Sequence, residues 1–203
     1  MQQQLTVLIS KLWWKSLVAD SRLDRYVTKM EIICETPRLV LRKVVQEDAS
    51  ALFEILGDSE VMRFSIHGPE TPEGVQKFLD ATFKRYSRDG FGQWAVIEKA
   101  SGNLIGECGI SVQIIDDTKE YEIGYRFSRQ SWGQGMATEA AIACRDFGFT
   151  KLKLEKLISL IEAENHQSIR VAEKVGMKLE KESVFHGIPV RIYVLKNPAA
   201  ERT

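Results

Sequence analysis

Apolar residues recur along most of the chain at two spacings, which predicts strands alternating with helices. Leu39 and Leu41 alternate with other residues and predict a short strand. Two helices should follow: one opens at Asp48, and the other has Thr71 as its cap and Pro72 at its first position. Their apolar stripes are Ala51, Leu52, Ile55 and Leu56 in the first helix, and Val75, Phe78, Leu79 and Tyr86 in the second.

The second half of the chain repeats this alternation. Strands are predicted at 93–98, 104–112 and 121–127, with Ser101-Gly102 as a hairpin turn between the first two. A helix follows a Gly-rich turn, a nearly continuous apolar strand covers 157–161, and a helix from about Gln167 ends at Gly176. Two strands flank residues 186–189. The order β-α-α-β-β-β-α-β-α-β-β predicts an α/β domain of about 165 residues, a mixed sheet with helices on both faces.

Residues 1–29 differ in pattern from the rest, so we divide the chain into an N-terminal extension (1–29) and one domain (30–203). Leu5, Leu8, Ile9 and Leu12 recur at helical spacing. Two interpretations remain open: an upstream extension from a misplaced start codon, or a helix that docks on the domain or on a partner. The segment lacks the basic start and the small-residue cleavage site of a signal peptide.

Composition narrows the class of function. Lys plus Arg and Asp plus Glu both number 28, so no overall field favours nucleic acid or an anionic membrane. No apolar run reaches the roughly 20 residues that span a bilayer. Three cysteines without C-x-x-C spacing, and three well separated histidines, argue against a disulfide framework and a metal site. We therefore expect a cytoplasmic protein without a bound metal, a nucleic-acid partner or a membrane partner.

The Gly-rich turn is the strongest candidate site. A strand ends at Phe127, Gly133 and Gly135 follow, and a helix begins at once. Backbone N–H groups at a helix start lack intrahelical partners and face the positive end of the dipole, so they suit an anion. No Lys-Ser or Lys-Thr follows, which excludes a P-loop, and Thr138 stands where a Rossmann motif needs its third glycine. A turn that merely needs two flexible residues is the plain alternative.

Four motifs in order resemble the GNAT superfamily of N-acetyltransferases, in its RimJ/RimL-like branch. They are the segments Glu35-Thr36-Pro37-Arg38-Leu39, Glu122-Ile123-Gly124-Tyr125, the turn from Gln130 to Ala140 (QSWGQGMATEA), and Asn165 to Met177. The resemblance spans Glu35 to about Asn197. It implies a mixed, mostly antiparallel sheet that splays between the strand before the turn and the next strand. It also implies acetyl-CoA as co-substrate.

The resemblance also implies where acetyl-CoA binds. Backbone groups of the strand before the turn would face the pantetheine arm and the thioester, the turn would hold the pyrophosphate, and the last helix would contact the pantetheine. The expected cofactor-binding residues are Tyr125, Phe127, Gln130, Trp132, Gly133, Gln134, Gly135, Met136, Ala137, Thr138, Asn165 and Ser168. Asn165 can equally serve as a helix N-cap, and the two roles are compatible.

The catalytic residues follow less directly. Many GNAT enzymes carry a tyrosine acid on the last helix, but residues 165–175 contain none. Ser168 is the candidate proton donor, with a local backbone-bonding role as its alternative. Glu122 is the candidate base, and Glu120 shares its strand face. A base is not essential for every acceptor, since an α-amine has a pKa of about 7.7–8.0, whereas a lysine side chain at about 10.4 needs more help.

The branch suggests an N-terminal α-amine of a protein, for example a ribosomal one, as the acceptor. The alternatives are a small metabolite or antibiotic amine, and a CoA-binding sensor or interaction module without catalysis. We expect a monomer or a homodimer. Acceptor choice should lie in two segments without readable motifs, 57–72 and 185–190.

Overall fold

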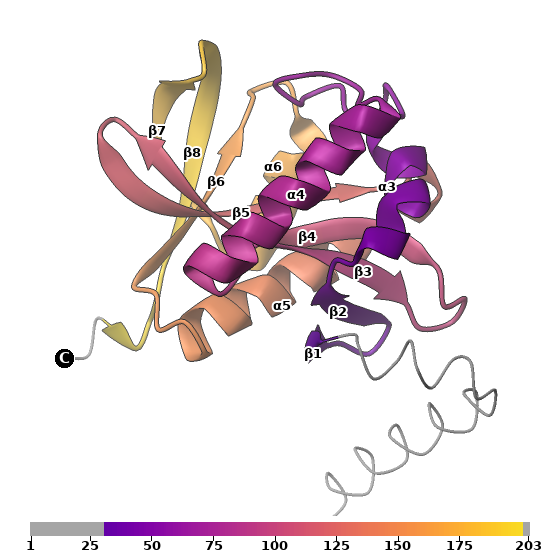
Figure 1. Cartoon of the computed structure of the whole chain (residues 1–203). Helices are drawn as coiled ribbons and strands as arrows, with labels where there is room; N and C mark the ends of the chain where they lie inside the picture. The colour runs from indigo at the N-terminus through magenta and orange to yellow at the C-terminus, as the bar shows by residue number, and fades with distance from the viewer. Residues whose placement is uncertain (1–30, 201–203) are drawn as a thin grey trace, which may run out of the picture. The chain divides into compact units, whose positions relative to one another are not determined.

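The computed structural model describes residues 31–200, which form an eight-stranded sheet of order β1-β2-β3-β4-β5-β6-β8-β7 with four α-helices (Figure 1). Neighbouring strands run antiparallel except for β5 and β6, which run parallel. The strands are β1 (Ile32–Glu35), β2 (Leu39–Lys43), β3 (Gln93–Glu98), β4 (Leu104–Ile115), β5 (Thr118–Phe127), β6 (Lys156–Ile161), β7 (Lys178–Phe185) and β8 (Ile188–Lys196). The predicted fold class is confirmed.

The helices begin and end where the sequence provides caps. They are α3 (Ala49–Leu56), α4 (Pro72–Asp89), α5 (Met136–Thr150) and α6 (His166–Val175). The Thr71 hydroxyl accepts from the Gly74 N–H at 3.1 Å, and Asn165 Oδ1 accepts from the Ser168 N–H at 3.1 Å. Gly176 ends α6 with φ of +99°, a conformation that suits glycine. Within the described residues, no helix is long and apolar enough to cross a membrane.

Two hydrophobic cores lie on opposite faces of the sheet. On one face α5 and α6 pack on the central strands, through residues such as Trp94, Ile110 and Ala140, which are all fully buried. On the other face α3 and α4 pack through Leu52, Leu79 and their neighbours. Figure 1 shows α4 crossing the central strands. Alternating side chains of each strand therefore divide between an α5/α6 face and an α3/α4 face.

The strands β5 and β6 separate soon after they meet. Only Glu122 and Ile158 pair across them, whereas β4 pairs with β5 along ten residues of each strand, from Ile115 and Thr118 to Gly106 and Phe127. Beyond this point a side chain replaces the ladder, because Ser159 Oγ donates to the Ile123 carbonyl at 3.0 Å. The sheet thus opens along residues 124–127 of β5, as the resemblance predicted.

Several boundaries differ from the sequence prediction. The strand β1 was not predicted; its four residues show no clear alternation, and it forms by pairing with β2 at the sheet edge. β4 reaches Ile115 and β5 begins at Thr118, since Asp116 and Asp117 take positive φ and form a two-residue turn. The predictions for residues 1–29 lie outside the described residues.

Candidate active site

The turn between β5 and α5 presents a row of open backbone N–H groups. Gly133 and Gly135 have φ of +73° and +78°, a region that costs other residues strain. No side chain caps α5, and the first N–H bonded back to the turn is that of Glu139, which donates to the Gly135 carbonyl at 3.0 Å. Among the described residues, the N–H groups from 133 to 138 have no acceptor. The helix dipole adds to their attraction for an anion.

The side chains of the turn brace it internally. Trp132 Nε1 donates to the Phe127 carbonyl at 2.9 Å, and Gln134 Nε2 donates to the Gln130 carbonyl at 2.7 Å. A Cβ atom at Gly133 would meet nothing within 4 Å, so the space before this residue is open. The turn is therefore held from within and open toward solvent, as an anion site requires.

The loop between β1 and β2 fixes the turn from outside. Arg38 Nη1 donates to the Gln134 carbonyl at 2.9 Å, and Arg38 Nε donates to Glu139 Oε2 at 2.7 Å. Thr36 Oγ1 donates to Glu139 Oε1 at 2.5 Å. Partial burial disfavours the charged form of Glu139, but the hydrogen bonds from Thr36 and Arg38 outweigh it and lower its pKa. We call Thr36, Arg38 and Glu139 the turn clamp.

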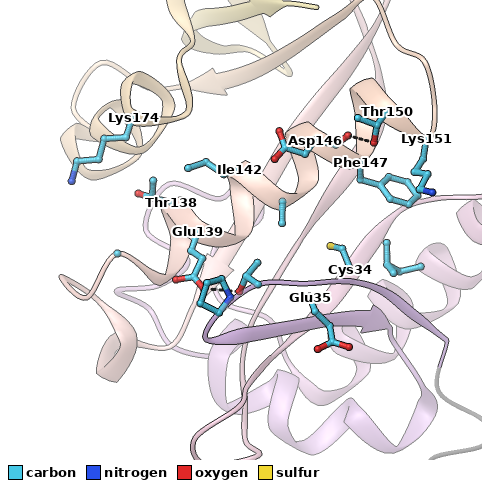
Figure 2. Close-up of a pocket in the computed structure, with 15 residues that line it drawn as sticks. Cys34, Glu35, Thr138, Glu139, Ile142, Asp146, Phe147, Thr150, Lys151 and Lys174 are labelled. Atoms are coloured by element: carbon cyan, nitrogen blue, oxygen red, sulfur yellow. Dashed lines mark hydrogen bonds between the residues drawn. The ribbon is translucent and has the colours of Figure 1, made fainter. Parts of the chain in front are cut away.

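A groove of about 700 Å³ begins at this turn and runs along α5. Gly135 and Thr138 line its beginning, and Figure 2 shows it between β1 and the side chains of α5. Cys34 lies in this groove. Burial is the main cause that raises the pKa of its thiol to about 12, and neighbouring acidic groups add to the shift. The Cys34 thiol therefore stays protonated near neutral pH and is a poor nucleophile.

Where β5 leaves β6, its backbone groups face the opening. Ile123 directs its carbonyl to Ser159 and Phe127 directs its carbonyl to Trp132, so the odd residues of β5 point away from β4. Tyr125 lies between them, and its N–H and carbonyl face the same way. Trp132 occupies the Phe127 carbonyl, and among the described residues β5 and β6 pair only at Glu122 and Ile158, so both backbone groups of Tyr125 and the N–H of Phe127 face the opening.

The start of α6 lies close to this opening. The Tyr125 hydroxyl donates to the Ser168 carbonyl at 3.4 Å, which brings the phenol to the first turn of α6. Burial is the main cause that raises the pKa of Tyr125, so the phenol stays protonated. Sequence reasoning considered only the backbone of Tyr125 and missed this side chain. The strand alternation with Ile123 and Phe127 was the signal that could have found it.

On the α3/α4 face, two glycines lie side by side at the centre of the sheet. Gly109 of β4 pairs with Gly124 of β5, and Gln93 of β3 pairs with Gly109. Glu122 lies on β5 to one side of this pair, and Gln113 Nε2 donates to its Oε2 at 2.7 Å. Burial raises the pKa of Glu122, although the Gln113 hydrogen bond and the charge of Arg126 oppose the shift. The Gln93 side chain lies over Gly109, whereas a Cβ atom at Gly124 would meet only Gln93 Nε2 within 4 Å among the described residues. We call the space over Gly124, beside Gln93, the acceptor hollow.

The other side of the hollow carries a buried ion pair. Glu107 is fully buried, and Arg126 Nη1 donates to its Oε1 at 3.1 Å. Burial raises the pKa of Glu107, and the charge of Arg126 opposes the shift. Arg126 Nε also donates to Ser65 Oγ at 3.0 Å, which ties β5 to the segment 57–72. Sequence reasoning missed Glu107; its signal was a charge inside the otherwise uncharged strand Leu104–Ile115.

The remaining candidates take structural roles. Glu120 accepts from Lys156 Nζ at 2.7 Å, so its carboxylate is already paired. Cys108 and Cys144 are buried free thiols with Sγ atoms 3.3 Å apart. In the part of the chain that the structure describes, no group of three or more His, Cys, Asp or Glu side chains could hold a metal.

The comparisons with known proteins fit this geometry. The family model described as an acetyltransferase (GNAT) domain matches residues 38–178, which include the turn, the opening of the sheet and the acceptor hollow. This chain belongs to the GNAT acetyltransferase family. It is therefore an acetyl-CoA-dependent N-acetyltransferase.

The proteins similar to this GNAT enzyme include several from bacteria. YkkB of Bacillus subtilis, which has no assigned function, is 35% identical over 163 residues, covering 80% of this chain and 94% of YkkB. Spermidine N(1)-acetyltransferase of Escherichia coli K12 is 28% identical over 142 residues, covering 70% and 74%. The Bacillus anthracis GNAT acetyltransferase structure has a TM-score of 0.70 and 29% identity, covering 80% and 97%.

One solved neighbour contains the co-substrate's carrier. RimL, a ribosomal L7/L12 α-N-protein acetyltransferase in complex with coenzyme A, has a TM-score of 0.70 at 18% identity, covering 83% of this chain and 99% of RimL. This likeness shows a common fold. The residues of this GNAT enzyme also fit such a ligand: the open N–H groups before α5 suit a pyrophosphate, and the open backbone groups of β5 suit the amides of a pantetheine arm.

Proposed function

We propose that this enzyme transfers the acetyl group of acetyl-CoA to the N-terminal α-amine of a protein, such as a ribosomal protein. The observation that carries the proposal is Glu122: its carboxylate, held by Gln113, lies on the α3/α4 face beside the opening of the sheet. Its pKa is raised, which makes it a better proton acceptor than an ordinary carboxylate. An α-amine of pKa about 7.7–8.0 needs less help than a lysine of about 10.4.

In this proposal the two faces of the sheet have different tasks. Bound acetyl-CoA supplies an activated thioester. The turn from Gln130 to Thr138 would hold its pyrophosphate, and Asn165 would contact the pantetheine. The open N–H groups of Tyr125 and Phe127 point into the gap beside β6, where they can polarise the thioester carbonyl.

Proton transfer would use one group on each side of the gap. Glu122 would accept the proton of the amine, directly or through water. A hydroxyl at the start of α6 would protonate the leaving thiolate, and both Ser168 and Tyr125 offer one there. The free, closely spaced thiols of Cys108 and Cys144 suit a reducing compartment such as the cytoplasm.

A polyamine is the second candidate acceptor. Two observations favour it: the 28% sequence identity with spermidine N(1)-acetyltransferase, and the carboxylates of Glu107 and Glu122 beside the acceptor hollow. The charge of Arg126 beside Glu107 opposes it, because a second ammonium group would lie near a guanidinium.

The test compares acceptors directly. Turnover of acetyl-CoA should be measured with lysine-free peptides bearing a free N-terminus, with the same peptides blocked at the N-terminus, with spermidine and with an aminoglycoside. We expect acetylation of the free peptides alone, with mass spectrometry locating the acetyl group at the α-amine. Turnover restricted to spermidine or the aminoglycoside would refute the proposal, and binding of acetyl-CoA without any turnover would indicate a sensor.

A further inference from the structure

Two nitrogens of the Arg126 guanidinium are held by hydrogen bonds. Nη1 donates to Glu107 Oε1 at 3.1 Å and Nε donates to Ser65 Oγ at 3.0 Å. Among the described residues, Nη2 has no acceptor. The Arg126 side chain is 33% exposed, while its partner Glu107 is fully buried. A guanidinium held on two sides therefore keeps its third nitrogen available to a ligand at this partly exposed position.

Arg126 and Glu122 lie at the two ends of the acceptor hollow. They project from the same face of β5, four residues apart, which is about 13 Å between Cα atoms in an extended strand. Gly124 lies between them, and among the described residues only Gln93 Nε2 comes within 4 Å of where a Cβ atom of Gly124 would lie. Glu107 Oε2 and Gln93 Oε1 are buried on this face without a hydrogen-bond partner among the described residues. Such unpaired polar atoms indicate a place where a polar ligand group belongs.

The two ends differ in what they recognise. A carboxylate at the Glu122 end suits an amine, whereas an open Nη2 donor suits a carbonyl or carboxylate oxygen. A peptide N-terminus has its amine and its first carbonyl within one residue, and further carbonyls follow at about 3.3 Å per residue. A polyamine has amines but no such oxygen, so it cannot satisfy Nη2.

We propose that Arg126 is the specificity-determining residue of this enzyme: its Nη2 donates to a backbone carbonyl of the acceptor and so selects peptide N-termini over amines that lack a carbonyl. Glu107 and Ser65 are positioning residues that hold the guanidinium at the hollow. The inference rests on the proposed function, since it assumes that a peptide α-amine is the acceptor.

A matched pair of acceptors tests the inference. One is a lysine-free hexapeptide with a free N-terminus; the other carries a trans-alkene in place of its first amide bond, which removes that carbonyl without adding charge. Wild-type enzyme should show a kcat/KM about 10- to 100-fold higher for the peptide, which corresponds to one hydrogen bond to a charged group. Arg126→Met should lose this preference through a higher KM for the peptide, with little change for the alkene.

Two further variants make the result specific. Arg126→Lys keeps the positive charge but loses the planar guanidinium with its fixed donors. This variant should therefore keep only part of the wild-type preference for the peptide over the alkene. Arg88→Met is the matched control, because Arg88 is 67% exposed on α4 and pairs with its neighbour Asp89. Titration with acetyl-CoA shows that each variant is folded, since this ligand binds on the other face.

The possible outcomes separate the two proposals. If wild-type enzyme acetylates spermidine but no peptide, the proposed function fails before any variant is made, and this inference fails with it. If the peptide is acetylated but Arg126→Met changes both acceptors equally, or neither, the proposed function stands and the role of Arg126 is overturned. A loss confined to the carbonyl-bearing acceptor supports the inference.

Discussion

At the scale of single residues, Glu122 gives the most direct test of the chemistry. Glu122→Gln should lower kcat/KM by about 10²- to 10³-fold, because general base catalysis contributes about this much. A base must be ionised to act, so wild-type activity should fall as the pH drops through the raised pKa of Glu122, above its ordinary value of 4.5. In the variant this acidic limb should disappear and leave only the titration of the acceptor amine. The measurement is a pH profile of kcat/KM.

The matched control for this variant is Glu120→Gln. Glu120 lies on the same strand face, but it forms an ion pair with Lys156. Its replacement should leave the shape of the profile unchanged. If both variants lose the same activity, or if Glu122→Gln keeps the acidic limb, Glu122 is not the base.

The proton donor to the thiolate is the second question at this scale. Tyr125→Phe should lower kcat about 10²-fold and leave the KM for acetyl-CoA nearly unchanged, because a phenol is a stronger acid than an aliphatic hydroxyl. Ser168→Ala should lower kcat less than tenfold. Pre-steady-state and steady-state rates with one peptide acceptor measure both variants. A larger loss in Ser168→Ala would assign the role to Ser168 instead.

The sequence predicts some of these residues better than others. Gly133, Gly135 and Thr71 follow from local chemistry, since a turn or a cap is recognised within a few residues. The Glu107–Arg126 pair joins neighbouring strands through their register, and a single sequence does not reveal that register. The phenol of Tyr125 needs α6 to be placed before its role can be seen. The residues that were predicted depend on local sequence, and those that were missed depend on contacts between segments far apart in the sequence.

At the scale of elements, the turn before α5 can be tested by adding one methyl group. Gly133→Ala should cost about 1–2 kcal/mol of stability, since φ is +73° and a Cβ atom there meets nothing within 4 Å. The methyl would occupy the open approach to the turn, so the Kd for acetyl-CoA should rise about tenfold. Calorimetry measures the binding, and thermal unfolding measures the stability.

Gly102→Ala is the matched control for the turn. Gly102 has φ of +71° and equally open surroundings, but it lies in the hairpin between β3 and β4. Its replacement should lower the melting temperature as much as Gly133→Ala does, with no effect on acetyl-CoA binding. Equal losses of affinity in the two variants would contradict the assignment of the turn.

The turn clamp links two elements that are far apart in sequence. Arg38→Ala removes the bonds to Glu139 and to the Gln134 carbonyl, so the KM for acetyl-CoA should rise about five- to tenfold while the acceptor KM stays constant. The clamp lowers the pKa of Glu139, so its stabilisation is complete above pH 4.5 and is lost as the pH falls through the lowered value. The stability difference between wild type and Arg38→Ala should shrink accordingly. A constant difference from pH 7 to pH 3 would contradict this account.

Helices and strands were predicted well where the hydrophobic pattern lies within their own residues. The stripe of α4 and the buried run of β6 follow from periodicity, and the structure confirms them. The strand β1 has no such pattern, because it becomes a strand only by pairing with β2. This matters for function, since the loop after β1 supplies the turn clamp.

At the scale of the whole molecule, the proposed function places the two substrates on different faces of the sheet, where they would meet at one opening. The Gly-rich turn and α6 border one side of the gap between β5 and β6, and the acceptor hollow lies on the α3/α4 face. Because side chains alternate along β5, the side chain of each residue lies on only one face of the sheet. The amine and the thioester can therefore meet while both are bound.

This arrangement predicts direct transfer through a ternary complex, without an acetylated enzyme. The described cysteines are poor nucleophiles: burial raises the pKa of Cys34 to about 12, and Cys108 and Cys144 are buried within the core. Initial rates measured over both substrate concentrations should give intersecting reciprocal plots, whereas a covalent intermediate would give parallel ones. Intact-mass analysis after incubation with acetyl-CoA alone should show unmodified protein. Parallel plots, together with an acetyl group on Cys34 that Cys34→Ser abolishes, would replace the ternary complex by a two-step transfer.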